Sequence, residues 1–157
     1  MVIAVFDKTD ESSPLVDSDV ILRYYEDRKH VVSELSLGGL QWEDRHLDQL
    51  ERIVRDKNPA RAICLQRLSL SNNLLTAKSG DSLAHILKNV HTLRELDLSD
   101  NRVEADGLDR LSDSLESDFC VLKTLNLFNN HLGSRCSKHI ASILRKNRSI
   151  VSLNIGK

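Results

Sequence analysis

The side chains best suited to catalysis or metal binding form no recognisable site in this sequence. The six histidines show neither H-x-x-x-H nor H-E-x-x-H spacing, and the three cysteines, Cys64, Cys120 and Cys136, include no C-x-x-C pair. The phosphate-binding patterns G-x-x-x-x-G-K-[ST] and G-x-G-x-x-G are missing, as is the nucleophile pattern G-x-S-x-G. The sequence therefore predicts no enzyme, no metal site and no cofactor.

Three asparagines recur at one position of a repeated pattern, and the chemistry of their amide groups suits a structural role. Asn73, Asn101 and Asn130 each follow two leucines in the pattern L-x-x-L-x-L-x-x-N-x-L, which is most regular over residues 122–132. At this position the chain turns from strand towards helix and leaves backbone groups unpaired. A buried amide can both donate to and accept from such groups. We expect these asparagines to stabilise the fold.

A second set of polar and aromatic side chains alternates with the leucines. In a strand the leucines point to one face and the intervening residues to the other, so successive copies line up a strip of outward residues. The candidate partner-binding residues on this strip and its adjoining loop are Arg67, Glu95, Asp97, Asn126, Phe128 and His131. The charged members could orient a partner, and Phe128 could anchor it. Alternatively, Phe128 folds over the rim and packs against His131 or the next repeat.

The elements that position these residues repeat along the chain. Copies of the pattern begin at Val32 (a weaker copy), Leu65, Leu93, Leu122 and Ile150 (a cut-off copy), at spacings of 33, 28, 29 and 28 residues. A short strand is predicted in each copy, for example over residues 68–70, 96–98 and 125–127. Apolar residues at helical spacing follow each strand, so one apolar helix face is available to lie against the strands.

A strand–helix unit of this length cannot bury its own apolar face, so neighbouring units must stack. Parallel strands stand about 4.8 Å apart, whereas packed helices stand about 8–10 Å apart. A stack of such units must therefore curve with its strands on the concave side. The predicted fold is an α/β solenoid with strands on the concave side and helices on the convex side.

The pattern, its period and the long helix in each unit resemble the ribonuclease-inhibitor class of leucine-rich repeats. The resemblance covers about residues 32–157 and includes the helical signatures at residues 83–88 and 140–147. It implies a protein-binding solenoid, as in ribonuclease inhibitor, Ran GTPase-activating protein, tropomodulin and the NOD-like receptor arrays. The first copy departs from the pattern, because Leu40 stands in the asparagine position and Trp42 in a core position.

Two regions are expected. Residues 1–30 are assigned to an N-terminal strand and helical cap, in which residues 13–30 have the capping role, Ser13-Pro14 begins the helix and the polar run at residues 26–30 ends it. The β-prone run at residues 1–6 could pair with the first repeat's strand or form a loose tail. Residues 31–157 are assigned to the leucine-rich-repeat domain, with about four repeats and a final strand. That strand has no helix after it, so we expect a longer array or self-association through this edge.

Composition and charge exclude several classes of partner. Apolar residues make up 40% of the chain, the formal net charge is −1, and no window approaches a membrane span. Residues 95–118 carry a net charge of −7 and residues 120–157 one of +7. Aligned repeats place Asp109 beside Lys138 and Glu116 beside Arg145, as matched stripes on the helical face or as a docking surface. We expect the protein to bind neither nucleic acid nor membranes. We also expect its cysteines to be unpaired and the protein to lie in the cytoplasm.

The leading functional hypothesis is an intracellular scaffold that binds a partner protein through its concave face and adjoining loops. Two alternatives remain open from the resemblance. One is a GTPase-activating or other regulatory module similar to Ran GTPase-activating protein. The other is an actin-capping role similar to tropomodulin. The sequence does not identify the partner.

Overall fold

Strands and helices alternate along the chain in the computed structural model, which describes residues 2–5, 32–55 and 64–156. The elements are β1 (Val2–Val5), β2 (Val32–Ser36), α2 (Asp44–Arg55), β3 (Arg67–Ser69), α3 (Ser79–Asn89), β4 (Glu95–Asp97), α4 (Glu104–Glu116), β5 (Thr124–Asn126), the 3₁₀ helix η2 (Ser134–Cys136), α5 (Ser137–Lys146) and β6 (Ser152–Asn154). The helical cap expected over residues 13–30 lies outside the described residues.

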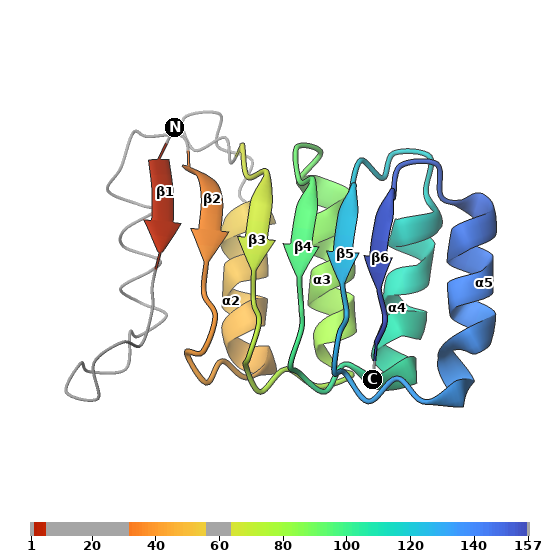
Figure 1. Cartoon of the computed structure of the whole chain (residues 1–157). Helices are drawn as coiled ribbons and strands as arrows, with labels where there is room; N and C mark the ends of the chain where they lie inside the picture. The colour runs from red at the N-terminus through yellow and green to blue at the C-terminus, as the bar shows by residue number, and fades with distance from the viewer. Residues whose placement is uncertain (1, 6–31, 56–63, 157) are drawn as a thin grey trace.

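The strands form one parallel sheet in the order β1-β2-β3-β4-β5-β6. The helices lie together behind the sheet, so the molecule has a strand layer and a helix layer (Figure 1). In β3, β4 and β5 pairing begins one residue earlier than the alternation predicted. The reason is that the residue before the leucine already joins the ladder: the amide of Glu95 donates to the carbonyl of Gln66 at 2.9 Å.

The N-terminal run takes the first of its two possible arrangements. β1 pairs in parallel with β2, with Ala4 opposite Leu35 and Val5 opposite Ser36. The sheet therefore extends one strand beyond the first repeat.

The recurring asparagines occupy the interior where each strand turns towards its helix, and their predicted structural role is confirmed. Asn101 Oδ1 accepts the amide of Leu75 at 3.1 Å, and its Nδ2 donates to the carbonyls of Leu70 and Leu98, each at 2.9 Å. Asn73 and Asn130 make equivalent bonds. Each amide thus links its own turn to the preceding repeat, which holds neighbouring strands in register.

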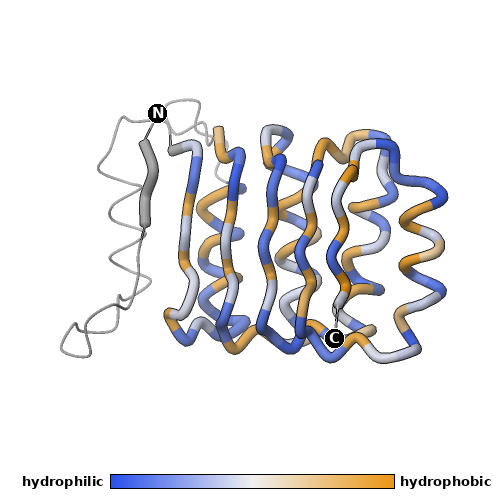
Figure 2. The backbone as a smooth tube through the Cα atoms, viewed as in Figure 1, coloured by the Kyte–Doolittle hydropathy of each residue, from blue (hydrophilic) through white to orange (hydrophobic). Residues whose placement is uncertain are grey.

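The core between the two layers is aliphatic and contains at least one leucine from every described repeat. Hydrophobic and hydrophilic positions alternate along the strands (Figure 2). Leu40, at the asparagine position of the first repeat, and Trp42 are both buried. The Trp42 ring also stacks on His46, with ring centroids 5.8 Å apart. The prediction that Trp42 belongs to the core is confirmed.

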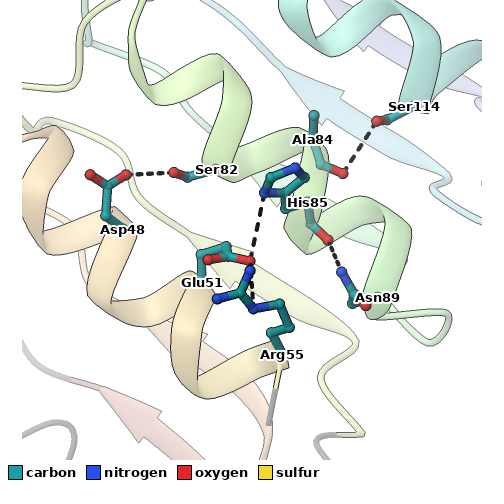
Figure 3. A network of polar contacts seen from close by, with 8 residues as sticks. All are labelled: Asp48, Glu51, Arg55, Ser82, Ala84, His85, Asn89 and Ser114. Atoms are coloured by element: carbon teal, nitrogen blue, oxygen red, sulfur yellow. Dashed lines mark hydrogen bonds and ion pairs between the residues drawn. The ribbon is translucent and has the colours of Figure 1, made fainter. Parts of the chain in front are cut away.

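Polar contacts tie the helices to one another (Figure 3). Ser82 of α3 donates to Asp48 of α2 at 2.5 Å, and the buried Glu51 carboxylate lies 3.7 Å from both the Arg55 and His85 nitrogens. None of the described helices is long and apolar enough to cross a membrane.

The acidic α4 and basic α5 also lie side by side, but their ion pairs differ from those predicted. Asp109 pairs with His139 at 2.9 Å rather than with Lys138, and Glu116 pairs with Lys146 at 2.7 Å rather than with Arg145. In each pair the contacting residue lies one position further along α5 than the aligned residue, although Arg145 is close enough for its charge to lower the pKa of Glu116. A step of one residue turns a side chain through about 100° around a helix, and linear repeat alignment does not resolve which side chain faces the neighbour.

Candidate binding face

The strand face opposite the helices contains an open hollow of about 380 Å³. It spans four consecutive strands, β2 to β5. Its lining residues are Glu34, Leu35, Ser36, Arg67, Leu68, Ser69, Glu95, Leu96, Asp97, Thr124 and Asn126. The leucines turn their side chains into the core, so the surface offered to a ligand comes from the polar residues between them.

The first row of outward residues contains an ion-pair triad. Strand register places Arg67 between Glu34 and Glu95. The Arg67 guanidinium bonds the Glu34 carboxylate, and its Nε lies 3.1 Å from Glu95 Oε1. These carboxylates, Glu34 foremost, raise the pKa of Arg67 above its usual value. Arg67 is therefore engaged within the sheet rather than free to meet an anionic group of a partner.

The second row of outward residues contains side chains that accept hydrogen bonds from the backbone just after their own strand. The Oδ1 atoms of Asp97, Asn126 and Asn154 accept the backbone amide two residues further on, at 3.0–3.1 Å. The Ser99 hydroxyl adds a second bond to Asp97 Oδ1 at 2.7 Å. Among the described residues, Asp97 Oδ2 and Asn126 Nδ2 have no hydrogen-bond partner, so these atoms remain available to a ligand.

Phe128 stands in the third row, just beyond the hollow. Its side chain is 41% exposed, and its ring lies beside Gly156 of the next repeat. A β-carbon built on Gly156 would stand 3.1 Å from Phe128 Cδ2. Phe128 thus leans towards the next strand while one part of its ring remains in solvent. It can still present an apolar surface at the edge of the hollow.

The structure brings together four of the six predicted residues. Arg67, Glu95, Asp97 and Asn126 line one hollow, whereas Phe128 is not among the lining residues and follows Asn126 by two positions. His131 is exposed on the turn after β5, in a left-handed backbone conformation with φ of 54°, and does not line the hollow.

Two leucine-rich-repeat family matches coincide with these repeats, at residues 64–86 and 91–112. The chain is also 36% identical over 91 residues to ribonuclease inhibitor from Sus scrofa, a match that covers 58% of the chain and 20% of that relative. The chain is a leucine-rich-repeat protein of the ribonuclease-inhibitor-like class. This assignment agrees with the parallel strands, the outer helices and the asparagine ladder.

Other relatives of this leucine-rich-repeat protein are much longer. NACHT, LRR and PYD domains-containing protein 12 of Mus musculus is 41% identical over 92 residues, covering 59% of the chain and 9% of the relative. NACHT, LRR and PYD domains-containing protein 3 of Homo sapiens is 30% identical over 136 residues, covering 80% of the chain and 13% of the relative. The chain thus spans about a tenth of the length of these two proteins.

Glu34 is the one charged lining residue that the candidate residues of the sequence analysis did not include. The signal was present in the repeat alignment, because Glu34, Arg67 and Glu95 occupy the same place in three consecutive repeats. Parallel strands in register bring such residues to neighbouring positions, so alternating charges at one repeat position predict a triad. In the described part of this leucine-rich-repeat protein, no group of three histidine, cysteine or acidic side chains could hold a metal ion.

Proposed function

We propose that this leucine-rich-repeat protein binds a partner protein on its strand face, across the hollow from β2 to β5. Leucine-rich-repeat domains generally mediate protein–protein interactions. The observation that carries the proposal is the hollow itself, about 380 Å³ of open space lined by polar side chains from four strands. Polar side chains in a concave site, with an apolar side chain beside them, are typical of binding surfaces.

Phe128 provides the apolar neighbour. Its ring is partly exposed two residues beyond the lining residue Asn126, on the side of Gly156. Aromatic side chains at interfaces frequently contribute more binding free energy than the polar contacts around them. The proposed contact surface therefore combines the charged and polar rows of the hollow with the exposed part of the Phe128 ring and the adjoining loop at His131.

Site-specific photo-cross-linking tests the proposal. A benzoylphenylalanine placed at Ser69 or Thr124 points into the hollow, whereas one placed at Lys88 lies exposed on α3 in the helix layer. We expect both hollow variants to cross-link the same protein in cell extract and the Lys88 variant not to do so. That protein, identified by mass spectrometry and then purified, should bind the unmodified chain directly. Cross-linking at Lys88 alone would contradict the proposal.

A GTP-hydrolysis assay separates binding from the alternative of GTPase activation. Single-turnover hydrolysis by a panel of small GTPases should proceed at the same rate with and without the chain. A faster rate with one GTPase would favour the regulatory alternative.

The proposed location is the cytoplasm. Cys64, Cys120 and Cys136 are all free thiols, which agrees with a reducing compartment. Fluorescence microscopy of a tagged chain in intact cells tests this location, and exclusion of the tag from the cytoplasm would contradict it.

A further inference from the structure

The charges that line the hollow do not cancel. Glu34, Glu95 and Asp97 are acidic, and among the residues that the structure describes Arg67 is the only basic one in the lining. Arg67 bonds Glu34 and Glu95 at once. One guanidinium is therefore shared between two carboxylates, and within residues 2–5, 32–55 and 64–156 no cation in the hollow pairs with the Asp97 carboxylate.

The basic residues that immediately precede the lining residues Glu95 and Thr124 do not supply that cation. Arg94 precedes Glu95, but its Nη1 donates to the carbonyl of Val121 at 3.0 Å, in the loop before β5. Lys123 precedes Thr124 and is exposed outside the lining. Arg94 and Lys123 therefore do not neutralise the net negative charge of the side chains that line the hollow.

Hydrogen bonds from Ser99, just after β4, hold the Asp97 side chain in a fixed orientation. Its Oδ1 accepts both the amide and the hydroxyl of Ser99, and its side chain is half-buried. Register places it between Ser69 on β3 and Asn126 on β5. Both neighbours are uncharged and can accept a hydrogen bond through an oxygen. A carboxylate preorganised in a concave, partly desolvated site favours a cationic group over a neutral one.

We propose that the hollow at Asp97 binds one cationic side chain, an arginine or a lysine that projects from the partner protein. This inference rests on the proposed function and specifies the chemistry of the partner at that site. The cation would meet Asp97 Oδ2 directly and gain from the shared charge of Glu95. Charge complementarity selects this occupant, because an acidic group would be repelled and a neutral one would leave Asp97 unpaired.

The acidic stripe on α4 provides an internal comparison. Asp113 is exposed on the convex side and does not line the hollow. Asp97→Asn removes the charge from the hollow, and the change should be tolerated by the fold. Asn126 and Asn154 occupy the same position in the next two repeats and make the equivalent bond to a backbone amide. Asp113→Asn removes an equal charge from the convex face.

The test is a titration of the ¹⁵N-labelled chain at low ionic strength with N-acetyl-arginine amide, N-acetyl-lysine amide and the neutral N-acetyl-glutamine amide. We expect the cationic probes to shift the amide resonances of residues 95–99 and 126 in a saturable manner. The neutral probe should leave them in place. The apparent Kd of the cationic probes should rise at least tenfold in Asp97→Asn and remain unchanged in Asp113→Asn.

Two results would overturn the inference. One is an equal response of the wild type and Asp97→Asn. The other is a diffuse response in which the amides of α4 shift as strongly as those of the hollow, which would indicate general attraction to acidic residues. Photo-cross-linking from Ser69 and Thr124 does not depend on the outcome of this titration and can still identify a partner. Failure of the cation site is thereby distinguishable from failure of the proposed binding face.

Discussion

The carbonyl oxygen of Gly107 in α4 lies against the Cα of Gly80 in α3, so closely that a β-carbon on Gly80 would stand 2.6 Å from it. Alanine normally stabilises a helix interior relative to glycine. Here we expect Gly80→Ala to destabilise the fold by about 1–3 kcal/mol, because the two helices must separate to admit the methyl group. Urea unfolding measures the change. Lys88→Ala on the exposed side of α3 is the control and should stay within about 0.5 kcal/mol.

Asn101 should matter far more to stability than an exposed residue of comparable size. Asn101→Ala leaves the buried amide of Leu75 and two carbonyls without their partner. We expect a loss of about 1–3 kcal/mol in the free energy of unfolding. Asp113→Ala on the exposed face of α4 should stay within about 0.5 kcal/mol. Equal shifts of the two urea midpoints would contradict the role assigned to the asparagine ladder.

Glu104 adopts a backbone conformation that glycine prefers. Its φ is 58°, the same value as that of Gly133 at the corresponding position of the next repeat. A non-glycine residue in the left-handed region costs about 1–2 kcal/mol. Glu104→Gly should therefore stabilise the fold by up to about 1 kcal/mol, once the added conformational entropy of the unfolded chain is subtracted. The thermal midpoint of this variant should rise accordingly. Gly133→Ala, the reverse change, should lower it. A lower midpoint for Glu104→Gly would contradict this account.

The ion pair between α4 and α5 should make stability depend on pH. The hydrogen bond from Lys146, assisted by Ser142 and by the charges of Lys146 and Arg145, lowers the pKa of Glu116. A carboxyl whose pKa is depressed in the folded state stabilises the fold above its unfolded pKa of about 4.3. That contribution is lost as the pH falls through the lower, folded-state pKa.

Glu116→Gln tests this dependence. The variant should be less stable than the wild type near neutral pH, by no more than about 1 kcal/mol because the Lys146 side chain is exposed to solvent. The difference should begin to shrink as the pH falls below about 4.3 and should vanish below the lower, folded-state pKa of Glu116. Urea unfolding across this range measures it, with Asp113→Asn as the control on the same helix. A difference that persists unchanged in acid would contradict the assignment to Glu116 ionisation.

Phe128 should contribute to binding rather than to the core. Once a partner is purified, we expect Phe128→Ala to raise the Kd at least tenfold, about 1.4 kcal/mol, with little change in the thermal midpoint. Phe119, 80% exposed in the loop between α4 and β5, offers a matched aromatic control outside the hollow. Unchanged affinity combined with a lower midpoint would show that the contact with Gly156 is the main role of Phe128.

Much of the architecture could be predicted because the repeats constrain one another. Leucines at identical positions must face the same core, and a buried asparagine at each turn must satisfy the same backbone groups. The pattern therefore predicted the parallel strands, the helix layer and the outward rows, including four of the residues that line the hollow. The boundaries of the strands differed by one residue, because the backbone ladder begins before the first inward leucine.

The contacts between side chains depended on the tertiary structure. Helix rotation about its axis decides that Asp109 meets His139 and Glu116 meets Lys146, and no linear alignment contains that rotation. Likewise, the sequence alone determined that Arg67 and Asp97 both face outward. Only strand spacing and register place Arg67 between two carboxylates, while no cation of the described part of the chain lies beside Asp97 in the hollow. Periodicity sets the direction in which a side chain points, whereas the packing of neighbouring repeats sets which charges it meets.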